Sequence, residues 1–310
     1  MDHIYLLWLQ QFREITDGVF DSFFLGISEL GERTVPLVVL SGIFWCLHKK
    51  AGRTILLGFT CAYWTMILTK ITACVYRPFM TDSRLHPLSN PNNYSFPSGH
   101  AYYATAYLGG IALWQWNSKA LRNTCLLLLA LILFSRNYIG VHTPQDVLCG
   151  SLFAFVIMGF VWKLAVYEES HPGFDKWILL LGLLLSGALA WFAVTKNYPL
   201  QTNEAGKLLI NPATAIKSAL RMAGWGIGFF IGWFIEKRWI QFSVEGTWQQ
   251  RCVRFILGTL GLWLVMKTLA SCIRYFLPGT TGLLLSNALP ALYIMCVVPL
   301  CIKYAEEYRK

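Results

Sequence analysis

Three short polar segments interrupt an otherwise apolar chain, and together they hold side chains that bind anions and move protons. The segments are residues 70–78, 97–100 and 135–146. Lysine and arginine side chains hold phosphate oxygens, and a histidine ring acts as a nucleophile or carries a proton. Ionisable residues in apolar surroundings are costly and usually mark a site. The three segments therefore predict a site for an anionic group.

In the first segment, Lys70 and Arg77 stand seven positions apart. The spacing predicts that both project from one helix face, with a rise of about 10 Å between them. Pro78 is expected to end that helix and to leave the Arg77 guanidinium at its rim. Two fixed cations on one stripe can hold an anion. Snorkelling of both side chains to lipid headgroups is an equally good explanation of this pair alone.

The second segment reads Pro-Ser-Gly-His at residues 97–100, directly before a hydrophobic run. Ser98 is suited to cap the N-terminus of the following helix, and Gly99 lets a ligand approach the backbone closely. The free N–H groups of the first turn then form a cradle for an anion. A plain helix cap explains Ser98 and Gly99 as well, and His100 taken alone is more often an interfacial residue.

The third segment adds a donor fork, Arg136, and a ring nitrogen, His142. Thr143 and Pro144 read as the cap and first residue of a helix, which places Asp146 in its first turn. A carboxylate there can reach the His142 ring and fix its tautomer, so that the other nitrogen is free to attack. A capping box between Thr143 and Asp146 is the alternative, and both roles can coexist.

The elements that must position these segments are membrane helices. Of the 310 residues, 55% are hydrophobic and 14% charged, which is unusual for a soluble protein. Apolar runs long enough to cross about 30 Å of hydrocarbon recur along the chain. About nine are predicted: 33–48, 54–76, 99–116, 122–140, 144–166, 176–195, 213–235, 254–276 and 283–303. The predicted fold is an all-α polytopic membrane protein, in which residues 17–32 form a partial or re-entrant helix that would alter the count.

Basic residues predict the orientation of these helices. Lysines and arginines cluster at 48–53, 117–122 and 237–254, and in the C-terminal tail, always on one side of the alternating spans. By the positive-inside rule that side is cytoplasmic, so the three polar segments are extracytoplasmic or lumenal. The expected location is the plasma (bacterial inner) membrane, or the endoplasmic reticulum. The net charge of +10 thus marks topology, and no nucleic-acid partner is expected.

The chain divides by sequence into three parts. Residues 1–32 are an N-terminal interfacial or re-entrant segment, residues 33–166 a helical core that carries the three motifs, and residues 167–310 C-terminal transmembrane helices of unassigned role. Gly224, Gly228 and Gly232 recur at intervals of four and permit close helix packing. A homodimer interface is the alternative explanation of this row.

Four further cations in the C-terminal part are predicted to lie in the outer half of the bilayer. They are Lys217, Arg221, Lys267 and Arg274. Each pair shares one helical stripe, so we expect a secondary site for a second phosphate or an anionic headgroup. Snorkelling at the interface, or contacts with Asn211 and Glu204, explain the same residues without a ligand.

The order K-x6-RP, PSGH and SR-x5-H-x3-D resembles the signature of the type 2 phosphatidic acid phosphatase (PAP2) superfamily, with every signature position filled. The resemblance implies a six-helix membrane-embedded catalytic core and a metal-independent phosphatase that uses a phosphohistidine intermediate and no cofactor. It makes His142 the nucleophile, Asp146 its partner, and His100 the acid that protonates the leaving alkoxide and then activates water. The implied phosphate-binding residues are Lys70, Arg77, Ser98, Gly99 and Arg136.

The predicted function is hydrolysis of a lipid phosphate monoester or diphosphate at the extracytoplasmic face. Phosphatidic acid, phosphatidylglycerol phosphate, polyprenyl diphosphate and sphingoid-base phosphate are the candidate substrates. No cluster of Asp and Glu at this face suits a divalent metal. A lipid-to-lipid phosphotransferase that uses the same histidine, and a non-catalytic lipid transporter, are the alternatives.

Overall fold

The computed structural model describes residues 2–203 and 205–307, and their regular elements are helices, as predicted. A single isolated β-bridge joins Thr202 and Leu208 within the described chain. The chain forms two units. Among the described residues, the first contains 2–37, 61–160, 196–203 and 205–215, and the second contains 38–60, 161–195 and 216–307.

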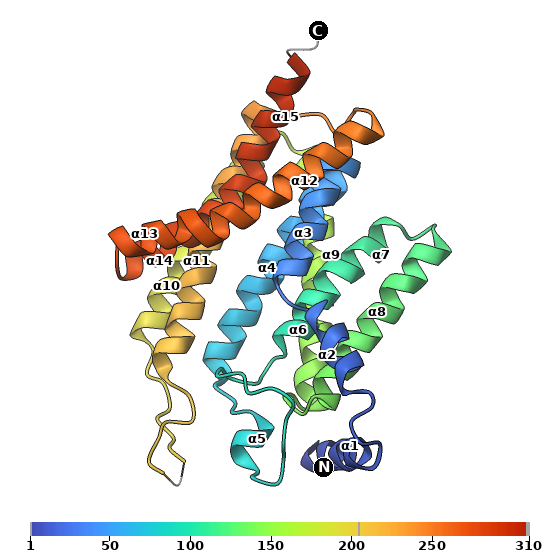
Figure 1. Ribbon diagram of the computed structural model, residues 1–310. Coiled ribbons are helices and arrows are strands. Elements are labelled where there is room, and N and C mark those ends of the chain that lie inside the picture. Colours follow the sequence, from blue (N-terminus) through green and yellow to red (C-terminus); the bar gives the residue numbers. More distant parts are fainter. Residues whose placement is uncertain (1, 204, 308–310) are drawn as a thin grey trace. The chain divides into compact units, whose positions relative to one another are not determined.

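The first unit contains the three polar segments (Figure 1). Its own helices are α1 (Asp2–Ile15), α2 (Asp21–Glu29), α5 (Pro78–Thr81), α6 (Gly99–Ala104), η2 (Thr105–Gly109), α7 (Gly110–Trp114) and α8 (Lys119–Tyr138). The π-turn η2 joins α6 to α7 in one continuous helical segment. Both α2 and α6 pack against α8.

Four helices continue from one unit into the other: α3 (Thr34–Gly42), α4 (Lys49–Ala73), α9 (Pro144–Ser170) and α11 (Pro212–Ile235). The remaining elements belong to the second unit. They are η1 (Ile43–Leu47), α10 (Asp175–Thr195), η3 (Glu236–Ile240), α12 (Trp248–Leu264), η4 (Val265–Leu269), α13 (Ala270–Phe276), α14 (Thr280–Leu292), η5 (Tyr293–Val297) and α15 (Val298–Glu307).

By length and composition, seven of the described helices can cross a membrane. The number rises to eight if α2 and the α3–η1 helix, which bend by 51° at the break between them, form one broken span. This bend lies where the sequence predicts a partial or re-entrant helix. The predicted span 99–116 is helical at Gly99–Trp114 but is shorter than the seven, so the count of nine is not confirmed. The chain is nonetheless an integral membrane protein by its repeated apolar helices.

The N-terminal helix α1 has apolar residues on two faces. Leu6 and Leu9 are buried in the first unit, whereas Ile4, Trp8 and Ile15 are exposed. A helix that offers an aromatic and aliphatic surface outside the protein core suits the boundary between headgroups and acyl chains. This pattern favours the interfacial position that the sequence predicts.

The glycine row of α11 serves packing inside the second unit. A Cβ at Gly224 would lie 2.2 Å from the Leu284 carbonyl oxygen, and one at Gly228 would lie 2.2 Å from the Ala288 carbonyl oxygen. The backbones of α11 and α14 therefore approach more closely than any larger residue allows. The homodimer hypothesis assigns this glycine face of α11 to a second copy of the chain, but α14 of the same chain packs against it.

Ion pairs join two of the basic segments that the sequence places on one side of the membrane. In the second unit Lys49 lies 2.6 Å from Glu236, which is fully buried, and Lys50 lies 2.5 Å from Glu169. Two further pairs are Lys237 with Glu168 and Arg238 with Asp175. Residues 48–53 and 236–238 thus meet at one end of the unit. A buried carboxylate such as Glu236 is tolerated only because cations accompany it.

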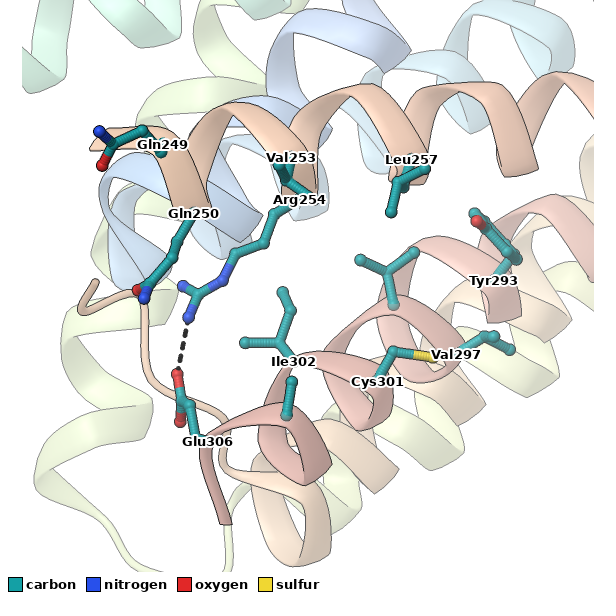
Figure 2. A pocket seen from close by; sticks show the side chains of 13 residues that line it. Gln249, Gln250, Val253, Arg254, Leu257, Tyr293, Val297, Cys301, Ile302 and Glu306 are labelled. Atoms are coloured by element: carbon teal, nitrogen blue, oxygen red, sulfur yellow. Dashed lines mark hydrogen bonds and ion pairs between the residues drawn. The ribbon is translucent and has the colours of Figure 1, made fainter. Parts of the chain in front are cut away.

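A groove of about 430 Å³ runs between α12 and the η5–α15 helix in the second unit (Figure 2). Its walls are largely apolar and include Leu257 and Val297, and an ion pair of 3.0 Å between Arg254 and Glu306 lies at one end. None of its thirteen lining residues is a histidine. The groove therefore lacks the nucleophile that the sequence motifs predict.

We predict that Gly228→Ala lowers the melting temperature of the detergent-solubilised protein. Alanine ordinarily stabilises a helix by about 0.5–1 kcal/mol relative to glycine. At Gly228 the new Cβ would collide with the Ala288 backbone, and overpacking of this kind costs about 1–3 kcal/mol. Gly187→Ala on α10 is the matched control, because its Cβ would meet nothing within 4 Å and should leave the melting temperature unchanged or higher. Equal shifts in both variants would contradict a tight α11–α14 contact.

Candidate active site

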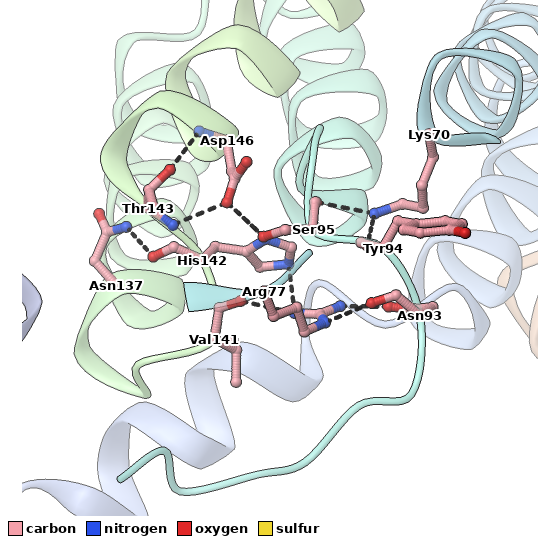
Figure 3. A network of polar contacts seen from close by, with 10 residues as sticks. All are labelled: Lys70, Arg77, Asn93, Tyr94, Ser95, Asn137, Val141, His142, Thr143 and Asp146. Carbon is pink, nitrogen blue, oxygen red and sulfur yellow. Dashed lines mark hydrogen bonds and ion pairs between the residues drawn. The ribbon is translucent and has the colours of Figure 1, made fainter. Parts of the chain in front are cut away.

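Residues of the first and third polar segments meet around His142, in the loop between α8 and α9 (Figure 3). The residue is 1% exposed. Its Nδ1 lies 3.2 Å from Ser95 Oγ and 3.4 Å from Asp146 Oδ2, and its Nε2 lies 3.2 Å from Arg77 Nη1. A carboxylate thus acts on one ring nitrogen and a guanidinium on the other.

The neighbours of His142 define its tautomer. Ser95 Oγ donates a hydrogen bond of 2.6 Å to Asp146 Oδ2, so its lone pairs remain to accept from the ring. The Arg77 guanidinium can only donate. We infer that Nδ1 carries the proton and that Nε2 carries the lone pair. This is the arrangement in which Nε2 can act as a nucleophile.

Asp146 also caps helix α9, so the two roles expected for it coexist. Its Oδ2 accepts from the backbone N–H of Thr143 at 2.9 Å, and its own N–H donates to Thr143 Oγ1 at 3.3 Å. Helix α9 begins at Pro144, as predicted. The capping box fixes the carboxylate in the first turn. One rigid carboxylate therefore serves both the helix end and His142.

The backbone of the His142 loop is held from two sides. Asn137 Nδ2 donates to the His142 carbonyl oxygen at 2.9 Å, and Arg77 Nη1 donates to the Val141 carbonyl oxygen at 2.8 Å. Gly140 adopts φ +81°, a left-handed conformation that favours glycine, where the chain turns out of α8. These contacts determine where the ring lies.

The prediction that Lys70 and Arg77 share one helix face is wrong. Helix α4 ends at Ala73, and Cys74 adopts a left-handed conformation with φ +50°. Arg77 has an extended backbone and precedes Pro78, the first residue of the short helix α5. Because the chain leaves the helix, the guanidinium reaches both the His142 loop and Asn93, whose carbonyl oxygen accepts from Nε at 2.9 Å.

Lys70 lies buried in the last turn of α4, and its ammonium group holds the loop before α6. Its Nζ donates to the carbonyl oxygens of Tyr94 at 2.7 Å and of Ser95 at 3.0 Å. Lys70 therefore helps to position Ser95, which bridges Asp146 and His142. Its charge also belongs to the cationic cluster around the ring.

Ser98 stands at the cap position of α6, as predicted, but its side chain makes no capping bond. Its Oγ is buried and has no hydrogen-bond partner among the described residues, whereas its backbone N–H donates to the Asp146 carbonyl oxygen at 2.9 Å. Buried polar atoms without a partner are rare and need an explanation. Gly99 meets Met66 and Tyr103 only at ordinary contact distances, so packing does not require a glycine there.

His100 and Arg136 face the turn that follows α2. His100 Nε2 forms an ion pair of 3.2 Å with Glu32 Oε1. Arg136 is 5% exposed, its Nη1 donates to Ser28 Oγ, and its Nε is a second buried atom without a partner in the described chain. The N-terminal segment, to which the sequence assigns no part in the site, thus contacts two of the predicted site residues.

Sequence reasoning missed the side chains that support the predicted ones. They are Ser28, Glu32, Asn93, Ser95 and Asn137. Ser95 carries a signal, since it lies only two positions before the second polar segment. Glu32 and Ser28 carry none, because only the folded chain brings them to α6 and α8.

The four predicted secondary cations all lie in the second unit and are all exposed. Lys217 and Arg221 are on α11, Lys267 is in η4, and Arg274 is on α13. Arg274 Nη2 donates to Ser271 Oγ at 2.9 Å. Glu204, a suggested partner of this group, lies outside the described residues. A secondary anion site stays a prediction.

The fold and the site together define a helical membrane protein with a buried His–Asp pair among three cations. No group of three His, Cys, Asp or Glu side chains within residues 2–203 and 205–307 is arranged to hold a metal ion. Residues 51–170 match a family model described as "PAP2 superfamily". Residues 220–305 match a second model, described as "PAP2 superfamily phosphatase, transmembrane extension". Together they cover more than half of the chain, which belongs to the PAP2 superfamily.

Two curated proteins are similar to part of the chain. An undecaprenyl-diphosphatase of Sulfolobus acidocaldarius is 31% identical over 143 residues, which are 46% of this chain and 66% of that protein. A lipid A 4'-phosphatase of Porphyromonas gingivalis is 26% identical over 171 residues, which are 49% of this chain and 68% of that protein. About a third of each relative therefore lies outside the match.

One solved structure is similar as well, the PAP2 type phosphatidylglycerolphosphate phosphatase from Bacillus subtilis. It is 25% identical in sequence, with a TM-score of 0.40. The similarity covers 50% of this chain and 79% of that one.

The surroundings of His142 predict how stability depends on pH. Burial, followed by the charges of Arg77 and Arg136, holds the pKa of the His142 imidazole well below its ordinary value of 6.5. Below pH 6.5 the unfolded chain binds a proton that the folded protein does not. The stability from this group is complete above pH 6.5 and falls with pH by up to about 1.4 kcal/mol per unit until the folded pKa is reached.

We therefore expect thermal unfolding in detergent to show a loss of stability between pH 7 and pH 5 that His142→Gln reduces. Glutamine keeps a polar side chain but does not titrate. The control is His171→Gln, at an exposed histidine stacked on Tyr167, which should keep the wild-type pH dependence. If His142→Gln and the wild type lose stability equally, the ring is not held neutral by the fold.

Proposed function

We propose that the protein is a membrane phosphatase that hydrolyses lipid phosphate monoesters or diphosphates through a phosphohistidine intermediate, without a metal ion. The observation that carries the proposal is the environment of His142. Its Nδ1 is held by Ser95 and Asp146, while Nε2 lies beside the Arg77 guanidinium. A phosphate bound by that guanidinium would bring its phosphorus close to the nucleophilic nitrogen.

In the first step, Nε2 of His142 forms a bond to phosphorus while the bond from phosphorus to the leaving oxygen breaks. The charge on the three equatorial oxygens must be stabilised in the transition state. The guanidinium groups of Arg77 and Arg136 and the buried Oγ of Ser98 are suited to this, and the Arg136 Nε and Ser98 Oγ have no other partner in the described chain. Gly99 at the start of α6, and the charge of Lys70, complete the proposed phosphate site.

His100 supplies the protons in the proposed cycle. Its ring gives a proton to the departing alkoxide, or to the departing phosphate of a diphosphate. In the second step the neutral ring takes a proton from water, and the water oxygen attacks phosphorus. The bond from phosphorus to Nε2 then breaks, and inorganic phosphate leaves with the lone pair of His142 restored.

The lipid class of the substrate rests on the membrane setting and on the relatives. The two curated relatives are named as an undecaprenyl-diphosphatase and a lipid A 4'-phosphatase, and both names refer to lipids. A lipid headgroup would enter the site from the membrane surface while its chains stay among apolar helices. The predicted orientation places this site at the extracytoplasmic or lumenal face. The proposed substrates remain the four classes of lipid phosphate that the sequence suggests.

The first test is phosphate release by the purified, detergent-solubilised protein from a panel of lipid phosphates and diphosphates, with and without EDTA. We expect release from at least one lipid to survive EDTA, because side chains provide the charge. His142→Ala should lower it by about 10³-fold or more, since the nucleophile is gone. His171→Ala removes an exposed histidine and is the matched control, expected to keep wild-type activity.

The same experiment separates the competing functions. Transfer of phosphate to a second lipid, without inorganic phosphate, would favour a phosphotransferase with the same histidine. No turnover on any lipid, with binding retained, would favour a transporter. Release that requires a divalent ion, or that persists in His142→Ala, would refute the proposed mechanism.

Ser98→Ala separates a ligand contact from a structural one. Ser98 Oγ bonds to no group of the described chain, so its loss should change the melting temperature little. If the oxygen instead contacts the phosphoryl group, kcat/KM should fall about tenfold, the effect of about one lost hydrogen bond. Both are measured on the same preparation. A lower melting temperature with unchanged kcat/KM would assign Ser98 to folding instead.

A further inference from the structure

The turn between α2 and α3 brings a carboxylate to the histidine that no motif pairs with an acid. Glu32 Oε1 lies 3.2 Å from His100 Nε2, and the two side chains are 54% and 19% exposed, respectively. This histidine is therefore more open to solvent than His142, which is 1% exposed. The contact joins residues 68 positions apart in sequence, so it reflects the tertiary fold.

The turn is held in place independently of this ion pair. Tyr107 lies in η2, seven residues after His100, and its Oη donates to the Leu30 carbonyl oxygen at 2.9 Å. Arg136 Nη1 donates to Ser28 Oγ. At the start of α2, Tyr138 Oη donates to Asp21 Oδ1 at 2.8 Å. Both η2 and α8 therefore fix the segment that carries Glu32.

Gly31 allows the turn to approach His100 closely. A Cβ on this residue would lie 2.9 Å from Ile132 Cγ2 and 3.1 Å from His100 Cδ2. A larger residue would press on the ring and displace it from the carboxylate. The backbone of the turn is thus part of the wall against which His100 rests.

The charges around His100 explain what the carboxylate does. Burial, followed by the charges of Arg136 on α8 and Arg77 before α5, lowers the pKa of the His100 ring from its ordinary value of 6.5 to about 4. Glu32 is the carboxylate that acts on it in the opposite sense. A proton donor in a cationic site needs such a counter-charge, since otherwise it would lose its proton before the leaving group departs.

We infer that Glu32 is the positioning residue that orients His100 and favours the protonated form of the ring, from which the leaving oxygen takes its proton. The inference rests on the proposed function. Glu32 itself exchanges no proton: one passes from His100 to the leaving oxygen, and another passes from water to His100 in the second step. The carboxylate stabilises the charged ring and holds Nε2, which leaves Nδ1 for the leaving oxygen and then the water.

The test compares substrates that differ in their need for an acid. We expect Glu32→Gln to lower kcat on an alkyl phosphate such as phosphatidic acid by about 10- to 100-fold, with KM within about twofold. The burst of p-nitrophenol from p-nitrophenyl phosphate should change less than about twofold, because this leaving group departs without a proton. The alkaline limb of the kcat profile on the alkyl phosphate should move to lower pH by about one unit. Glu32→Asp, which keeps the charge, should recover part of the loss.

Glu14→Gln is the matched control, because it neutralises an exposed carboxylate on α1 whose described partner is Gln10, and it should match the wild type in every assay. Equal slowing of both substrates by Glu32→Gln, with an unmoved pH profile, would reduce Glu32 to a structural role and overturn the inference.

A measurement without turnover separates this inference from the proposed function. In protein labelled with ¹⁵N-histidine, the NMR titration midpoint of His100, assigned by comparison with His100→Gln, should move to lower pH in Glu32→Gln and not in Glu14→Gln. An unmoved midpoint would overturn the inference even in an active enzyme. A moved midpoint in a protein that releases no phosphate would leave the electrostatic coupling standing and remove the proposed reaction.

Discussion

The site depends on keeping several cations together in a buried space. Lys70, Arg77 and Arg136 are all at least 93% buried, and Asp146 is the carboxylate that acts on both Lys70 and Arg77. Burying an unpaired charge costs several kcal/mol. Backbone carbonyl oxygens offset part of this cost, since those of Asn93, Tyr94, Ser95 and Val141 accept from the two cations. These carbonyl dipoles stabilise the cations in part, as the phosphate oxygens of the proposed substrate would.

This requirement explains why the helices end where they do. A carbonyl oxygen inside a helix is already bonded, so the acceptors must come from irregular backbone. Residues 74–77, 82–98 and 139–143 provide it, between the ends of α4, α6, α8 and α9. The left-handed residues Cys74 and Gly140 end two of these helices. Non-helical backbone is tolerated in a membrane protein where it is buried in protein and its polar groups are bonded.

What the sequence predicts correctly in this protein is local. The capping box of Thr143 and Asp146 spans three residues, and both of its hydrogen bonds form. The predicted position of Arg77 on the same helix face as Lys70 is wrong, because a spacing of seven places two residues on one face only if the helix is continuous. The hydrogen bonds from Arg77 to Asn93 and Val141 favour an extended chain instead. The all-α fold follows from composition, but the length of the 99–114 helix does not. Because this helix is too short to be counted as a span, the predicted number of nine is not confirmed. Glu32 could not be found, because no local pattern links it to His100.

The roles proposed for the two histidines make opposite electrostatic demands within one cationic site. A nucleophile must be neutral, and a general acid must be charged. His142 is buried, touches a guanidinium directly at Nε2 and meets Asp146 at 3.4 Å, with Ser95 between them. His100 is partly exposed and touches a carboxylate directly. Pairs of titratable groups whose environments differ in this way divide the acid and base roles between them. The proposed division, with His142 as nucleophile and His100 as acid, matches the charge that each ring touches, which is a guanidinium for His142 and a carboxylate for His100.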